Sequence, residues 1–505
     1  MSQNLFDRLV RTAQDIARKA IENVDGTVYS YGDLFDLAGR LANVLVAQGV
    51  KPGDRVAVQV EKSVPALMLY LAALRAGAVY LPLNTAYTLA ELEYFIGDSE
   101  PSLVICDPAT KTGMNALAAK VGARVLTLDP AGHGELMDAA GQAPAAFATI
   151  ARNGDDLAAI LYTSGTTGRS KGAMLTHDNL HSNSTTLVDY WRFTQHDVLI
   201  HALPIYHTHG LFVATNVILF SGASMIFLPK FDPDKIMALL PRATSLMGVP
   251  TFYVRLLQHA SLNTDAVKSM RLFVSGSAPL LADTHREWSA KTGHAILERY
   301  GMTETNMNTS NPYDGDRVPG AVGYPLPGVL VRIADPESGA LMGVDEIGMI
   351  EVKGPNVFKG YWRMPEKTAA EFKPDGFFIT GDLGKIDARG YVHIVGRGKD
   401  LIITGGFNVY PKEIESEIDA MPGVFESAVI GVPHPDFGEG VTAVVVRTQA
   451  DAIDETAIIA ALQDRLAKFK QPKKVIFLDD LPRNTMGKVQ KNVLRDQYAE
   501  LFTKG

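Results

Sequence analysis

The chain has 505 residues, of which 46% are hydrophobic and 21% charged. This is the composition of a globular protein that is long enough for two or more domains. Its 48 Lys and Arg residues against 56 Asp and Glu residues give a formal net charge of −8, and no long basic run interrupts the mixture, so the composition excludes nucleic acid as an expected partner.

The single cysteine, Cys106, excludes an internal disulfide framework and any multi-cysteine metal site, and it fits a reducing compartment. The first residues show charges at helical spacing and no uninterrupted apolar core, so no export is implied and we expect a cytoplasmic protein. The apolar stretches 64–83 and 211–228 are interrupted by polar residues or proline. We therefore expect buried helices and strands there, and no membrane span.

The first 150 residues alternate short apolar runs with helical patterns. Residues 55–60 and 103–105 are typical of buried strands, whereas 65–76 has a helical pattern. Such alternation predicts α/β layers with parallel strands.

The last part of the chain has a different pattern. Residues 377–406 hold short apolar runs between Gly and Asp, which predicts antiparallel strands with reversals at Gly381 and at 389–390. Beyond them we expect an α+β unit with a helix at 411–421, strands at 428–432 and 441–447, and a helix at 456–466. The short charged join at 396–400 suits a hinge between domains, although a plain surface turn fits its composition equally well.

Residues 162–172 read YTSGTTGRSKG. Small residues, hydroxyls and a Lys are typical of a loop that cradles phosphate, with a flexible surface loop as the alternative. Lys171 is followed by a strand-like run, and a helix start comes only at 176–178, so the loop links two strands and is not a Walker-type loop. The glycines at 396–398 lack a third Gly or Ala at dinucleotide-motif spacing, which argues against hydride chemistry.

Four further motifs follow this loop along the chain: YGMTE at 300–304, TGD at 380–382, GRGKDLIITGGFN at 396–408 and RNTMGK at 483–488. Together the five resemble the adenylate-forming superfamily of acyl-CoA synthetases, luciferases and peptide-synthetase adenylation domains, over nearly the whole chain. The resemblance implies an α/β protein whose large N-terminal domain, residues 1–396, has two mostly parallel layers and a distorted β-barrel. A hinge at 397–400 would join it to a small mobile α+β domain, residues 401–505.

The resemblance also implies two half-reactions. A carboxylate attacks the α-phosphate of ATP to give acyl-AMP and pyrophosphate, and the thiol of coenzyme A then displaces AMP. By this resemblance, pyrophosphate would be held by Thr163, Ser164, Thr166, Thr167 and Lys171. Thr303 would contact the α-phosphate, and Glu304 would bind Mg²⁺. Tyr300, beside 276–278, would stack on adenine, and Asp382 and Arg397 would contact the ribose.

Lys488 matches the lysine that reaches from the small domain to the α-phosphate and the substrate carboxylate. In the family, rotation about the residue that corresponds to Lys399 withdraws this lysine and brings in Gly405 and Gly406, which leave room for the pantetheine arm. By the same analogy Lys488 is a candidate for regulatory acylation, which would remove its charge and would need a lysine acyltransferase as partner.

The acid is expected to be small and polar, because residues after Glu304 and in the helix 280–288 are polar where a fatty-acid tunnel would be apolar. The stretch SGSAPLLADTHREW resembles that of malonyl-CoA synthetases. This implies that Arg286 pairs with the second carboxylate of malonate, with methylmalonate as a tolerated analogue and with His207 and Ser277 as supporting donors.

Three other functions stay open at this point. A CoA ligase for another small acid would share every motif. A luciferase-like monooxygenase has less support, because nothing supplies a second chemistry. A regulatory nucleotide-binding protein without turnover would keep the ATP residues but would not need Lys488 or the Gly405–Gly406 segment.

Overall fold

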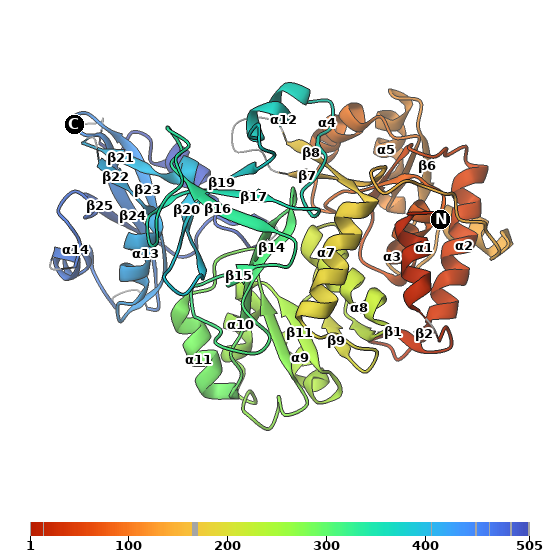
Figure 1. The fold of residues 1–505 in the computed structure, drawn as a ribbon, viewed down its shortest axis with the longest axis horizontal. Helices are drawn as coiled ribbons and strands as arrows, with labels where there is room; N and C mark the ends of the chain where they lie inside the picture. Colours follow the sequence, from red (N-terminus) through yellow and green to blue (C-terminus); the bar gives the residue numbers. More distant parts are fainter. Residues whose placement is uncertain are drawn as a thin grey trace.

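The computed structural model describes residues 2–13, 15–163, 170–405, 407–449, 452–463, 465–484 and 487–502. Within these residues the strands form four sheets along the long axis of the molecule (Figure 1). The N-terminal helices lie at one end of this axis, the C-terminal sheet and the chain's C-terminus lie at the other, and β16, β17, β19 and β20 lie between them.

The first sheet confirms the predicted parallel α/β layer. Its strand order is β18 (Gly360–Tyr361), β8 (Lys171–Thr176), β7 (Leu157–Thr163), β4 (Val79–Pro82), β3 (Arg55–Gln59), β5 (Leu103–Cys106) and β6 (Arg124–Thr127). β4, β3, β5 and β6 pair in parallel, and β7 and β8 form an antiparallel hairpin. The helix predicted at 65–76 is α3 (Val64–Arg75), and it is apolar on all sides because it is buried on all sides.

The second sheet is also parallel in its centre. Its order is β15 (Tyr324–Pro325), β14 (Asn306–Ser310), β13 (Leu297–Met302), β12 (Leu272–Ser275), β11 (Ser245–Gly248), β9 (Val198–His201), β10 (Ser224–Phe227), β1 (Lys19–Asn23) and β2 (Val28–Ser30). Its antiparallel pairs, β13 with β14, β14 with β15 and β1 with β2, lie toward its two ends. The YGMTE motif therefore lies where β13 turns into β14.

The helices of the large domain surround these two sheets (Figure 1). They are α1 (Leu5–Thr12), α2 (Tyr31–Ala47), α4 (Leu89–Ser99), α5 (Lys111–Ala119), α6 (Glu135–Gln142), α7 (His177–Tyr190), α8 (Asn216–Ser221), α9 (Pro233–Leu239), α10 (Pro250–Leu257), α11 (Ala282–Thr292) and α12 (Pro365–Glu371), with a π-helix at His209–Thr215.

A smaller antiparallel sheet corresponds to the expected barrel region. It contains β16 (Leu330–Ala334), β17 (Gly348–Lys353), β19 (Phe378–Ile386) and β20 (Val392–Arg397). The reversal predicted at 389–390 is confirmed, with Gly390 at φ +87°. The reversal predicted at Gly381 is wrong, because Gly381 adopts φ +75° inside β19 and the strand continues through it.

The C-terminal sheet has its own apolar core, which supports a separate C-terminal domain. Its order is β22 (Phe407–Val409), β21 (Ile402–Thr404), β24 (Gly438–Arg447) and β23 (Val424–His434), with β25 (Lys474–Leu478) paired to β24. The predicted helices and strands are confirmed by α13 (Pro411–Asp419), β23, β24 and α14 (Glu455–Gln463), and α15 (Lys491–Gln497) follows. The exact hinge residues stay a prediction.

Neither apolar stretch considered for a membrane span forms one continuous helix. Residues 64–83 contain α3 and β4, and 211–228 contain part of the π-helix, α8 and β10. Among the residues described, no helix is both long and apolar enough to cross a membrane.

Candidate active site

The strands on either side of the glycine-rich loop pair as an antiparallel hairpin, as the sequence predicted. β7 ends at Thr163 opposite Lys171, the first residue of β8. Both ends of the loop are held by α4, because the Tyr162 hydroxyl donates to Asp98 and the Tyr94 hydroxyl donates to the Ser170 carbonyl at 2.7 Å. Ser164, Thr166 and Thr167, predicted to bind phosphate, lie outside the described residues.

The local sequence explains how the chain leaves the loop. A Cβ on Gly172 would lie 2.9 Å from the Ile160 side chain, so only glycine permits this close approach. Thr176 then caps α7 through a reciprocal capping box with Asn179, at 3.1 and 2.9 Å. The predicted helix start directly after β8 is confirmed.

Lys171 and Glu304 belong to one connected network. The Lys171 ammonium lies 3.1 Å from Glu371 Oε1 and 4.1 Å from the centre of the Tyr361 ring. The Tyr361 hydroxyl lies 2.6 Å from Glu371 Oε2 and 3.0 Å from Glu304 Oε1. Burial raises the pKa of Glu304, while the Tyr361 hydrogen bond and the Lys171 charge act in the opposite direction. Sequence reasoning did not identify Tyr361 and Glu371.

The surroundings of Glu304 fit a Mg²⁺ ion that is held mainly by a bound nucleotide. The described residues contain no group of three or more His, Cys, Asp or Glu side chains that could hold a metal. Glu304 itself is a buried carboxylate, a hard oxygen ligand. Mg²⁺ is commonly bound by one or two carboxylates with phosphate oxygens and water, so this donor set is suitable.

Tyr300, Asp382 and Arg397 lie together as one hydrogen-bonded group. The Tyr300 hydroxyl donates to Asp382 Oδ2 at 2.6 Å, and Arg397 Nε donates to Asp382 Oδ1 at 2.8 Å. Asp382 and Arg397 are separate in sequence but lie directly opposite each other on the paired strands β19 and β20, so their side chains meet. Each carboxylate oxygen keeps a free lone pair, so the predicted ribose contacts remain available.

Lys488 lies near this group, although it comes from the C-terminal domain. Its side chain keeps a solvent-exposed surface, yet the surrounding protein and then the Arg397 charge lower its pKa to about 8, with Asp382 acting in the opposite direction. The preceding Gly487 faces Thr251 of α10 in the large domain, since a Cβ on Gly487 would lie 3.7 Å from that side chain. The two domains therefore meet at the Lys488 loop.

Lys488 is fixed within its own domain by backbone contacts. Asn484 Oδ1 accepts from the Lys488 N–H at 2.9 Å, and Arg483 donates to the Gly487 carbonyl at 2.7 Å while it pairs with Glu426. The predicted hinge residue Lys399 lies in a short 3₁₀ turn, Gly398–Asp400. Gly405 has φ +57° and donates to the Phe437 carbonyl at 2.8 Å, and Gly406 lies outside the described residues.

Among the described residues, the buried arginine Arg299 has no carboxylate partner. Arg299 on β13 is 4% exposed, and its Nε and Nη2 have no hydrogen-bond partner. Its guanidinium lies against Gly276, where a Cβ would approach it to 2.2 Å. Burial lowers the pKa of Arg299 to about 9.

Two neutral histidines and a serine belong to the same cluster. Burial and the Arg299 charge lower the pKa of His207 to about 4 and lower that of His209 well below its usual value. His209 Nδ1 lies 3.1 Å from Ser277 Oγ, and Ser277 adopts φ +71°. The cluster is thus a cation surrounded by uncharged polar groups, a suitable environment for a carboxylate.

The predicted role of Arg286 stays a prediction. Its side chain is 65% exposed and pairs at 2.6 Å with Asp283 one turn away on α11. The buried residues of α11 are Thr284, His285, Trp288 and Thr292. Such an exposed pair within one helix is weak, so it does not exclude Arg286 as a substrate ligand, and the buried Arg299 is a second candidate. Arg299 directly precedes the YGMTE motif and follows Glu298 in β13, so two charged residues within a buried strand were the available signal.

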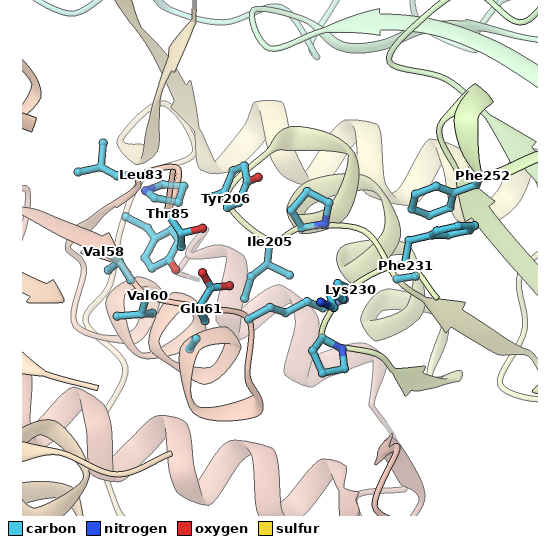
Figure 2. A pocket seen from close by; sticks show the side chains of 17 residues that line it. Val58, Val60, Glu61, Leu83, Thr85, Ile205, Tyr206, Lys230, Phe231 and Phe252 are labelled. Atoms are coloured by element: carbon cyan, nitrogen blue, oxygen red, sulfur yellow. The ribbon is translucent and has the colours of Figure 1, made fainter. Parts of the chain in front are cut away.

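A cavity of about 240 Å³ adjoins the segment that leads to His207 (Figure 2). Ile205, Tyr206, Glu61 and Lys230 lie in its middle, Leu83 and Thr85 toward one end, and Phe231 and Phe252 at the other (Figure 2). The two phenylalanine rings stack with centroids 4.1 Å apart.

Comparisons with known proteins agree with this geometry. The AMP-binding enzyme family matches residues 8–362, and the AMP-binding enzyme C-terminal domain matches residues 413–488. The chain belongs to the AMP-binding enzyme family. It is 34% identical to a malonate–CoA ligase of Arabidopsis thaliana over 97% of this chain and 87% of that protein. It is 38% identical to a feruloyl-CoA synthase of Amycolatopsis over 99% of this chain and 100% of that protein.

Among solved structures, ATP-bound MatB from Rhodopseudomonas palustris is 73% identical, with a TM-score of 0.98 over 99% of this chain and 100% of that chain. The apo structure of MatB, also 73% identical over 99% and 100% of the two chains, has a TM-score of 0.87. The present structure therefore resembles the ATP-bound form more closely, which agrees with the position of Lys488 beside Arg397 and Asp382.

Proposed function

We infer that the chain is a malonate–CoA ligase that uses ATP and an acyl-AMP intermediate. Relatives named for malonate ligation match nearly its whole length. The choice of a dicarboxylic acid rests on Arg299, because this buried cation has no carboxylate partner among the described residues. A dicarboxylic acid can present one carboxylate to the α-phosphate and the other to this guanidinium.

In the first half-reaction a malonate oxygen bonds to the α-phosphorus while the bond to the bridging oxygen breaks and pyrophosphate leaves. We propose that Lys488 offsets the repulsion between carboxylate and phosphate, with Thr303 as a further α-phosphate contact. Thr163, Ser164, Thr166, Thr167 and Lys171 would hold the leaving phosphates. Tyr300, Asp382 and Arg397 would bind the nucleoside. Bound Mg²⁺ at Glu304 would supply charge neutralisation of the phosphates.

In the second half-reaction the CoA thiol, losing its proton, displaces AMP from the acyl carbon. We propose that Lys399 is the hinge about which the C-terminal domain rotates. Rotation would withdraw Lys488 and bring in Gly405 and Gly406, where the absence of side chains leaves room for the pantetheine arm.

Methylmalonate is proposed as a second substrate, since it keeps both carboxylates and adds one methyl group. His207, His209 and Ser277 would then support Arg299 in binding the distal carboxylate. A ligase for another small acid stays the alternative.

We also propose Lys488 as a site of acylation by a lysine acyltransferase. With a pKa of about 8, its amine is neutral, and hence nucleophilic, far more often than that of an ordinary lysine. Stoichiometric acetylation at Lys488 should stop acyl-AMP formation, and full activity of the acetylated enzyme would refute this role.

The test of the function is AMP release with CoA and a panel of acetate, propionate, malonate, methylmalonate, succinate and a medium-chain acid. Malonate should give the highest kcat/KM, followed by methylmalonate, because acetate and propionate leave Arg299 without a partner. A higher kcat/KM for a monocarboxylic acid would contradict the substrate assignment. A nucleotide-binding protein without turnover would release no AMP with any acid.

A further inference from the structure

Glu371 occupies a position that its own helix does not favour. It is the last residue of α12, where a carboxylate faces the negative end of the helix dipole. Two of its contacts are tertiary, to Lys171 Nζ at 3.1 Å and to the Tyr361 hydroxyl at 2.6 Å, and the third is to Lys367 Nζ one turn earlier in the same helix, at 2.8 Å. The contacts with Lys171 and Tyr361 therefore explain a carboxylate at this position better than the stability of α12 does.

These contacts hold Glu371 charged and close to the phosphate loop. Burial alone would raise the pKa of Glu371, but hydrogen bonds from Lys367 and Tyr361 and the charge of Lys171 bring it below its usual value. The side chains of Lys171 and Glu371 are only 16% and 18% exposed. Within the described part of the chain, Glu371 is the one carboxylate at ion-pair distance from Lys171.

We propose that Glu371 is a positioning residue that limits how tightly Lys171 holds pyrophosphate. The inference rests on the proposed function, in which Lys171 binds the leaving phosphates. An ammonium group has three donors, so Lys171 can stay bonded to Glu371 while it also contacts a phosphate oxygen. The carboxylate fixes the direction of the ammonium group and offsets part of its charge.

The physical reason concerns the product. Binding that is equally strong in the substrate and in the transition state does not speed the chemical step, and a product that is held too tightly leaves slowly. Pyrophosphate carries more charge than the same phosphates within ATP, so an uncompensated lysine would favour the product most. Partial compensation by Glu371 therefore lowers product affinity more than it lowers transition-state stabilisation.

The experiment measures pyrophosphate binding by calorimetry at a fixed Mg²⁺ concentration, together with pyrophosphate product inhibition. Glu371→Gln keeps the size and one hydrogen-bond acceptor but removes the charge, and it should lower the Kd for pyrophosphate about threefold to tenfold, the size expected of an ion pair that is mostly but not fully buried. The KM for malonate should not change. Glu366→Gln is the matched control, because Glu366 is an exposed carboxylate in the first turn of α12.

A double-mutant cycle with Lys171→Ala separates the proposed role of Glu371 from the proposed binding of pyrophosphate by Lys171. Lys171→Ala should raise the Kd for pyrophosphate, and Glu371→Gln should then have no further effect. An unchanged or higher Kd in Glu371→Gln, or an equal gain with and without Lys171, overturns the role of Glu371 while leaving the ligase function intact. If Lys171→Ala does not weaken pyrophosphate binding, the assignment of Lys171 to the leaving phosphates fails, and this inference fails with it.

Discussion

In the nucleotide cleft, two predicted cations already have carboxylate partners: Arg397 pairs with Asp382 and Lys171 with Glu371. In the proposed acyl pocket the buried cation Arg299 has no carboxylate partner among the described residues, and His207 and His209 beside it are neutral. Charges that are already paired can stay buried without a nucleotide, and we propose that the Lys171–Glu371 pair also helps pyrophosphate to leave. The charge without a partner suits a ligand that brings its own carboxylate, and the predictions below test whether the two regions differ in this way.

The largest expected effect tests the cleft. Lys488→Ala should reduce ATP–pyrophosphate exchange by about a thousandfold or more, because a preorganised charge at the reacting phosphate is lost. Thioester formation from supplied malonyl-AMP should remain. Lys468→Ala, an exposed lysine of the same domain, is the control. Exchange at the parental rate in Lys488→Ala would refute the role of this lysine.

The next effect tests the acyl pocket. Arg299→Met should lower kcat/KM for malonate by roughly a hundredfold to a thousandfold, since a buried carboxylate without its partner costs about 3–5 kcal/mol. Its Tm should not fall, because the substitution removes an uncompensated buried charge. Arg286→Ala, which alters an exposed pair with Asp283, should stay within about twofold of the parent. A larger loss of kcat/KM for malonate in Arg286→Ala than in Arg299→Met would assign the substrate carboxylate to Arg286.

A pH profile tests the charge of Lys488 in the nucleotide cleft. Lys488 is charged below its pKa of about 8 and neutral above it, so the rate of acyl-AMP formation should fall as pH rises past this value, with the midpoint moved upward by bound phosphates. Lys488→Arg, which stays charged, should lose this basic limb even if its maximum rate is lower. A basic limb that is identical in both enzymes would assign it to another group.

The smallest effect concerns the nucleoside contacts. Tyr300→Phe keeps the ring but removes the 2.6 Å hydrogen bond to Asp382, so KM for ATP should rise by about threefold to tenfold with kcat nearly unchanged. An unchanged KM for ATP would show that Arg397 alone holds Asp382 in place.

Much of the fold followed from local patterns. The strand 55–60, the helix 65–76 and the C-terminal helices were predictable because apolar periodicity and turn residues act over a few positions. Gly381 was misread because a glycine at positive φ can bend a strand without ending it. The loop hairpin was predictable because Lys171 is followed by strand residues and not by a helix start.

The sequence by itself determined the family and, through it, the two half-reactions. It also singled out Tyr300, Asp382, Arg397 and Lys488, because each of these residues belongs to a motif. Only the tertiary structure decided that Arg299 is buried and Arg286 exposed, and that Glu371 reaches Lys171 across 200 positions in the chain. The physical reason is that burial and the pairing of charges depend on which segments pack together. Two arginines thirteen positions apart can look equally suitable until a strand buries one and a helix exposes the other.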